Sequence, residues 1–321
     1  MLYFGLLILL ILCQLFYFKI AEKYNIIDIP NERSSHNSIT LRGGGIIFPI
    51  ATFIAFLTHD VTWPVMLAIV IVSIISFIDD INPVNLLPRF LVHILAVVLL
   101  LFDLKLFNES FILLSIIAIM MIGWINAFNF MDGINGITVL YTSIAIISFG
   151  LLEVNKDEYH LLLVVGSACI VFGFFNVRKI AKTFAGDVGS ISLAVFLGFL
   201  MMKTIKETNQ IGFILFFSVY GVDSCFTIIN RLIKGENILK GHRTHLYQFL
   251  ANEFKIVQIK ISSIYAFIQL IINLSVIHLF NTGKLDYLTI SIYIIFISVI
   301  YILIRIYVLK KINYKTLIAN K

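Results

Sequence analysis

The stretch "FILLSIIAIMMIGWINAFNFMDGINGITVLYTSIAIISFGLL" (residues 111–152) places a short polar segment between two apolar runs. With their flanking residues, the runs approach the ~20 mostly apolar residues that a membrane-crossing helix needs. The segment between them, 126–138, carries three Asn, one Asp and two Gly. This pattern predicts two membrane helices joined by a loop whose polar side chains take part in chemistry.

The composition extends this pattern to the whole chain. It has 321 residues, of which 60% are hydrophobic and 13% charged, whereas soluble proteins have about 45–50% and about 25%. We therefore predict a single all-α polytopic transmembrane domain, 1–321. The net charge of +6 is modest and does not indicate a nucleic-acid partner. The first apolar segment has no small-residue cleavage site after it and is interpreted as a retained helix.

Apolar runs bounded by polar, Gly or Pro residues predict eleven membrane helices. Their predicted ranges are 2–19, 44–58, 61–78, 89–102, 110–125, 135–152, 159–176, 188–203, 211–230, 257–280 and 286–309. The second and fourth are short for a full crossing.

The distribution of Lys and Arg between the loops predicts the orientation. Nineteen of the 24 lie on one side of the predicted helices, and five lie on the other. This bias places the first set in the cytoplasm, the N-terminus outside and the C-terminus inside. The polar joints between helices then gather on the cytoplasmic side, which predicts that the chemistry is concentrated on that face of the membrane.

Asp79 and Asp80 end the third predicted helix, where two carboxylates oppose the helix dipole and repel each other. A bound cation or a proton would relieve both costs; alternatively, the pair is solvated or caps the next helix. Asp187 in "GDVGS" and Asp132 in "DGINGIT" precede helices, so each is either an N-cap or part of an anion site formed by exposed amides.

The string "HRTH" contains His242, Arg243 and His245. Two His three residues apart can share a zinc ion, but no further ligand lies nearby in sequence. A phosphate-binding cluster and a solvated loop are the other interpretations. Asp223, in the middle of a predicted helix, is an acid that can face the helix interior and support the site.

Taken in order, four strings resemble the polyprenyl-phosphate N-acetylhexosamine-1-phosphate transferases, glycosyltransferase family 4. They are "FIDD" (77–80) followed by Arg89, "NAFNFMDGINGI" (126–137), "FNVRKIAKTFAGDVGS" (175–190) and "HRTHLYQ" (242–248). The resemblance implies that undecaprenyl phosphate attacks the β-phosphorus of a UDP-N-acetylhexosamine and UMP leaves. It also implies Mg²⁺, or Mn²⁺, and is compatible with a homodimer.

The resemblance also assigns roles to residues. Asp79, Asp80, Asp187 and His245 match catalytic positions, with Asp187 as the metal ligand. Whether the reaction is direct or passes through a covalent aspartyl intermediate stays open. The expected substrate-binding residues are Arg33, His36, Asn126, Asn129, Asp132, Asn135, Asn176, Lys182, Phe184, His242 and Arg243.

The chain departs from many relatives at three positions. Asn135 stands where a second Asp is common, and Tyr247 and Gln248 stand where "HLHH" has two His. The string "HRTHLYQ" looks closer to the branch that initiates O-antigen or capsule units with 6-deoxy-N-acetylhexosamines. The alternative function is a transporter of an anionic solute, which would normally place ionisable groups near the bilayer midplane.

Overall fold

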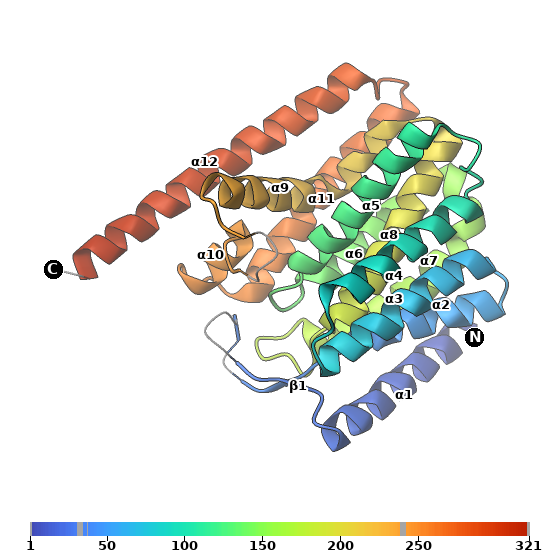
Figure 1. Cartoon of the computed structure of the whole chain (residues 1–321), viewed down its shortest axis with the longest axis horizontal. Helices are drawn as coiled ribbons and strands as arrows, with labels where there is room; N and C mark the ends of the chain where they lie inside the picture. The colour runs from blue at the N-terminus through green and yellow to red at the C-terminus, as the bar shows by residue number, and fades with distance from the viewer. Residues whose placement is uncertain (1, 31–34, 37, 238–241, 320–321) are drawn as a thin grey trace.

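The computed structural model describes residues 2–30, 35–36, 38–237 and 242–319. The chain forms helices with one two-stranded hairpin (Figure 1). In chain order the elements are α1 (Leu2–Lys23), β1 (Ile27–Asp28), β2 (Thr40–Leu41), η1 (Gly44–Ile46), α2 (Ile47–Leu57), α3 (Trp63–Ile81), α4 (Leu86–Asp103), α5 (Phe111–Phe130), α6 (Ile137–Gly150), η2 (Glu153–Glu158), α7 (Tyr159–Asn176), α8 (Gly186–Thr208), η3 (Ile211–Phe217), α9 (Ser218–Ile233), α10 (Leu246–Asn252), α11 (Gln258–Asn281) and α12 (Tyr287–Ala319).

The helices support an all-α polytopic membrane protein. Among the described residues, nine helices are long and apolar enough to cross a membrane, and two shorter apolar helices cover Gly44–Leu57 and Ile137–Gly150. Every predicted range contains a helix. The fourth is longer than predicted, because α4 begins at Leu86 and ends at Asp103. The short α10 was not predicted, and the number of crossings and the orientation stay predictions.

α8 is the central helix of the bundle. It is apolar on all sides, and nearly every residue from Val188 to Thr204 is buried. A helix that is apolar all round is stable only where other helices surround it. α3 and α5 pack against it, so the ends of these three helices are held beside each other.

The ninth predicted helix is broken. A 3₁₀ segment, η3, leads into α9, which lies across the direction of α5 and α8 (Figure 1). A break exposes backbone polar groups, which inside a membrane must find partners. Gln269 of α11 supplies them: it accepts the Val219 N–H at 3.0 Å and donates to the Leu215 carbonyl at 2.8 Å.

The β1–β2 hairpin connects the first loop to the segment before α8. Leu41 accepts the Phe184 N–H at 2.8 Å, and the Gly44 N–H donates back to the Phe184 carbonyl at 2.9 Å. These backbone bonds hold Arg42 beside the start of α8.

Candidate active site

Three carboxylates and two arginines meet where α3 ends and α8 begins. Arg42 Nε lies 2.8 Å from Asp80 Oδ1, and Arg89 Nη1 lies 2.8 Å from Asp79 Oδ2. Arg89 Nη2 also lies 3.0 Å from Asp187 Oδ2, and Arg42 Nη2 lies 3.8 Å from Asp187 Oδ1. The two guanidinium groups offset much of the repulsion that the sequence predicted for adjacent acids.

Asp80 is buried and serves as a cap for α8. Its Oδ1 accepts the Asp187 N–H at 2.9 Å, and its Oδ2 accepts the Val188 N–H at 3.0 Å. A carboxylate at a helix N-terminus is favourable because it satisfies free amides and faces the positive end of the dipole. The capping interpretation of Asp187 is therefore wrong, since the cap comes from another helix and Asp187 lies in the first turn.

Gly186 makes this arrangement possible. Its φ is +71°, and a Cβ there would lie 2.4 Å from Asp80 Oδ2. Any other residue would push the carboxylate away from the amides that it accepts.

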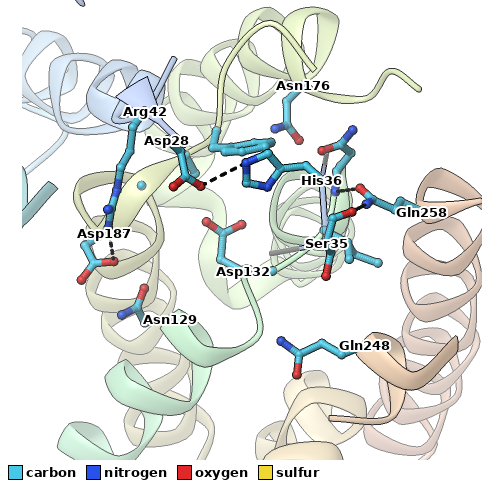
Figure 2. Close-up of a pocket in the computed structure, with 16 residues that line it drawn as sticks. Asp28, Ser35, His36, Arg42, Asn129, Asp132, Asn176, Asp187, Gln248 and Gln258 are labelled. Carbon is cyan, nitrogen blue, oxygen red and sulfur yellow. Dashed lines mark hydrogen bonds and ion pairs between the residues drawn. The ribbon is translucent and has the colours of Figure 1, made fainter. Parts of the chain in front are cut away.

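A polar cavity of about 290 Å³ opens beside this cluster (Figure 2). It is formed by the first loop, the end of α5, the 126–138 loop, the segment before α8 and the starts of α10 and α11. Its lining residues are Asp28, Ser35, His36, Arg42, Asn129, Asp132, Gly133, Ile134, Asn135, Asn176, Phe184, Ala185, Gly186, Asp187, Gln248 and Gln258.

Asp132 lies near the middle of this cavity, facing His36 (Figure 2). Its Oδ1 accepts a hydrogen bond from the Thr138 hydroxyl. Burial raises the pKa of Asp132 to about 6, and the nearby Asp187 carboxylate adds to the increase. Burial lowers the pKa of Arg42, but Asp80, Asp187 and Asp28 outweigh it and raise that pKa above its ordinary value. Arg42 therefore stays charged.

Three predicted residues form one wall of the cavity. Phe184 lines it and packs against the His36 ring, with ring centroids 4.7 Å apart. Asn176 is held in place by the backbone, accepting the Gly136 N–H and donating to the Thr183 carbonyl, each at 2.8 Å. An aromatic ring beside fixed amides suits a flat, hydrogen-bonding base.

Two Asn side chains keep free bonding capacity at the cavity. Asn129 Oδ1 accepts the Ser190 hydroxyl. Asn135 donates to the Arg178 carbonyl at 2.8 Å, while its buried Oδ1 has no hydrogen-bond partner among the described residues. A buried acceptor without a partner is costly unless a ligand or water satisfies it.

His245 is buried next to the cavity rather than in its lining. Its Nδ1 lies 3.2 Å from Asp223 Oδ1, and its Nε2 is buried without a described partner. Tyr265 and Tyr301 also donate to Asp223, at 2.8 Å and 3.0 Å. The structure thus places Asp223 where the sequence expected a supporting acid.

The residues that follow His245 differ in their contacts. Tyr247 is fully buried, and its hydroxyl donates to the Phe130 carbonyl at 3.0 Å. A Cβ on Gly133 would lie 2.2 Å from that hydroxyl, so the loop passes the ring only because residue 133 is Gly. Gln248 lines the cavity, and its Oε1 accepts the His245 N–H at 3.2 Å.

Other predicted residues lie elsewhere. Asn126 donates to the Ile122 carbonyl of its own helix, and Lys182 pairs with Glu22 at 2.9 Å. Neither lines the cavity. His242 packs on His245, and its pKa is lowered to about 4, chiefly by burial. Arg243 borders a second cavity. Arg33 lies outside the described residues.

Sequence reasoning did not select five polar side chains that line the cavity, those of Asp28, Ser35, Arg42, Gln248 and Gln258. Arg42 carried one signal, because it precedes the glycines of "RGGG" in a polar joint. Nothing in the sequence indicates that Gln258, the first residue of α11, donates to the Ser35 carbonyl and accepts the Asn135 N–H at 2.9 Å.

Among the described residues, no group of three or more His, Cys, Asp or Glu side chains is arranged to hold a metal ion. Mg²⁺ bound with a diphosphate commonly uses only one or two carboxylates, however, and takes its other ligands from water and phosphate. Asp187 in the cavity fits this donor set.

An apolar groove of about 340 Å³ lies between α2 and α3. Its lining includes Phe77, Ile78 and Val188, which are next in sequence to Asp79 and Asp187 or close to them. The groove and the polar cavity are therefore lined by neighbouring residues at the start of α8, Val188 for the first and Asp187 for the second.

The chain is similar to known proteins over much of its length. Residues 62–205 match the model of glycosyl transferase family 4. A probable undecaprenyl-phosphate N-acetylglucosaminyl 1-phosphate transferase of Bacillus subtilis (strain 168) is 25% identical over 256 residues, which cover 72% of this chain and 71% of that protein.

Two phospho-N-acetylmuramoyl-pentapeptide-transferases match over about a third of their length. The protein of Streptococcus agalactiae serotype Ia is 33% identical over 106 residues, covering 32% of this chain and 31% of that protein. The protein of Lactococcus lactis subsp. cremoris (strain MG1363) is 34% identical over 110 residues, covering 34% and 32%.

Proposed function

The chain belongs to the polyprenyl-phosphate N-acetylhexosamine-1-phosphate transferases, glycosyl transferase family 4, and on this premise we propose that it transfers a sugar 1-phosphate from a UDP-sugar to undecaprenyl phosphate. The observation that carries the proposal is the junction at Asp187. There Asp187 lines a polar cavity suited to a nucleotide, and the next residue, Val188, lines an apolar groove suited to a prenyl chain. A transferase that joins a soluble donor to a lipid acceptor needs both surfaces at one point.

The reaction balances as one phosphoryl exchange. An oxygen of the lipid phosphate bonds to the β-phosphorus of the UDP-sugar, the bond between that phosphorus and the bridging oxygen breaks, and UMP leaves. Phe184 and Asn135 would hold the base end of the donor, and Asp132 and Asn129 would orient it. Arg42 and Arg89 are placed to attract the two phosphate groups, and positioning them is a large part of catalysis.

Asp187 would hold Mg²⁺ or Mn²⁺, which supplies charge neutralisation for the crowded phosphates. The charges of the cavity support this role. Asp28, Asp132 and Asp187 line it against one Arg, so a diphosphate would meet net negative charge without a cation. Asp80 fixes the backbone of Asp187, and Asp79 holds Arg89; both act on the site from outside the cavity lining.

We place this activity at the first membrane step of O-antigen, capsule or cell-wall polysaccharide synthesis, on the cytoplasmic face of a bacterial inner membrane. For the sugar we propose a 6-deoxy-N-acetylhexosamine, such as N-acetylfucosamine or N-acetylquinovosamine. Of the two residues that depart from the His-rich relatives, Gln248 lines the cavity and Tyr247 does not. Gln248 supplies a neutral amide to the donor pocket.

Release of UMP from a UDP-sugar tests the proposal. Membranes carrying the protein should release UMP only when undecaprenyl phosphate is also present. Among three donors compared side by side, UDP-6-deoxy-N-acetylhexosamine should have the highest kcat/KM, and UDP-MurNAc-pentapeptide should not be used. A preference for UDP-N-acetylglucosamine would contradict only the proposed identity of the sugar. The absence of UMP release with every donor would contradict the proposed transferase activity.

A further inference from the structure

A second cavity of about 710 Å³ adjoins the first. The two share a wall made of Ser35, His36, Asn135, Phe184 and Gln258. Beyond that wall the second cavity extends between the segment after α7 and the segment that joins α10 to α11. A ligand in the second cavity therefore has Phe184 in its wall, and the other face of that wall borders the first cavity.

The two cavities differ sharply in charge. The first is lined by three carboxylates and Arg42. The second is lined by Arg178, Lys179, Arg243 and Lys255, and by no Asp or Glu among the described residues. Four cations in one hollow attract an anion at distances up to the Debye length, about 10 Å at 0.1 M salt.

Lys179 lies in the segment after α7, and Lys255 lies in the segment that joins α10 to α11. Both line this cavity and are exposed. Neither forms an ion pair with a described residue, unlike Arg42 and Arg89 in the carboxylate cluster. Their charge is therefore available to a solute.

The second cavity also offers buried polar atoms. Asn252 lines it, and the buried Nδ2 of this residue has no hydrogen-bond partner among the described residues. Asn135 Oδ1, in the shared wall, is the acceptor already noted to have none. A donor and an acceptor without partners indicate that a polar ligand or water satisfies them.

We infer that this basic cavity is a capture site for the anionic nucleotide donor, which binds there before its base enters the first cavity past Phe184. The inference rests on the proposed function, because the donor that it names is a nucleoside diphosphate sugar. It assigns to Lys179 and Lys255 a part in donor association and none in the chemical step.

The test uses the full chain in nanodiscs of zwitterionic phosphatidylcholine. The double variant Lys179→Gln/Lys255→Gln should lower kcat/KM for the UDP-sugar about tenfold at low ionic strength, as expected when electrostatic attraction of a ligand is weakened. The difference from the wild type should shrink as salt is added, and kcat at saturating donor should not change.

Lys105→Gln/Lys284→Gln is the matched control. Both lysines are exposed in loops at the opposite end of the bundle, and Lys105, with φ 51°, reproduces the positive φ of Lys255, 56°. This control should keep the wild-type kcat/KM and salt dependence. Equal salt dependence in the test variant and the wild type would overturn the inference.

The association rate of UMP separates this inference from the proposed function. UMP should associate with the wild type faster than with the test variant at low salt, whether or not turnover occurs. Equal association rates would overturn the capture site even if the transferase activity stands. An effect that appears only in nanodiscs containing anionic phosphatidylglycerol would assign the cavity to a lipid phosphate and likewise overturn it.

Discussion

Asp80 accepts the backbone N–H of Asp187 at 2.9 Å, so one acid of the cluster fixes the position of another. The two carboxylates therefore have separable roles. Asp80 has three donors around it and lies outside the cavity lining, whereas Asp187 lines the cavity. The first should matter for both folding and activity, and the second for activity alone.

Replacing Asp80 by Ala should destabilise the protein. Arg42 and two backbone amides of α8 would lose their partner, and a buried donor left without a partner costs about 1–3 kcal/mol. We expect a clear fall in thermal-unfolding midpoint in detergent and loss of UMP release. Asp79→Asn, which removes a charge next to Arg89, is the comparison. This variant should also lose activity, but its unfolding midpoint should fall less than that of Asp80→Ala. An Asp80→Ala variant as stable as the wild type would contradict the capping role.

Asp187→Asn should fold normally and lose at least about two orders of magnitude in rate, the usual loss when a metal ligand or charge stabiliser is removed. A chelator should abolish wild-type activity, and Mg²⁺ or Mn²⁺ should restore it. Initial rates of UMP release and the unfolding midpoint together check this. Turnover near the wild-type rate in the well-folded variant would remove Asp187 from the site.

The raised pKa of Asp132 predicts a dependence of stability on pH. Because burial raises this pKa from 3.8 to about 6, the folded protein keeps the proton at pH values where the unfolded chain has lost it. The stabilisation that this proton gives is fully present below the pKa of Asp132 in the unfolded chain. It is lost as pH rises through about 6, the pKa in the folded protein.

Asp132→Asn imitates the protonated acid and can still accept the Thr138 hydroxyl. Its unfolding midpoint should equal that of the wild type near pH 4. At about pH 8 it should be higher than that of the wild type. A constant difference between the two midpoints over this range would show that the carboxyl does not titrate in this way. Activity of the variant should be low at every pH.

Filling the apolar groove should affect the lipid acceptor alone. Val70 lines the groove, and Val70→Trp should raise KM for undecaprenyl phosphate several-fold while KM for the UDP-sugar stays unchanged. Val98→Trp, on the exposed face of α4, is the control. Unchanged KM for the lipid in a folded Val70→Trp protein would place the prenyl chain elsewhere.

The distribution of positive charge predicts the orientation. A reporter fused after Lys321 should be active only if it works in the cytoplasm, and one inserted near Asn281 only if it works outside. The reverse pattern would contradict both the orientation and the cytoplasmic placement of the site.

The helices were predictable because long apolar runs have few other stable states in a membrane. The kink before α9 was not, because it depends on Gln269, fifty residues beyond Val219, to satisfy the freed backbone. The polar joints were correctly expected to meet, since helix ends on one side of a membrane are confined to one layer.

Individual side-chain directions were less predictable. Asn126 and Asn129 stand in the same string, yet the first bonds to its own helix and only the second lines the cavity. Three residues of helix leave them only about 60° apart around the helix axis, so the packing of α5 on α8 decides which of the two lines the cavity. Arg42 was counted only as a loop charge, because its carboxylate partner lies 38 residues away.

The contact between Gly133 and Tyr247 has a consequence for how these two positions can change in evolution. The space of a side chain at one position is occupied by the hydroxyl of the other, so the two residues cannot vary independently. A lineage that enlarges residue 133 must first accept a smaller residue at 247. A chimera that exchanges only the 242–248 segment with a relative inherits half of this pair, and transplanting both loops together is the route that preserves their fit.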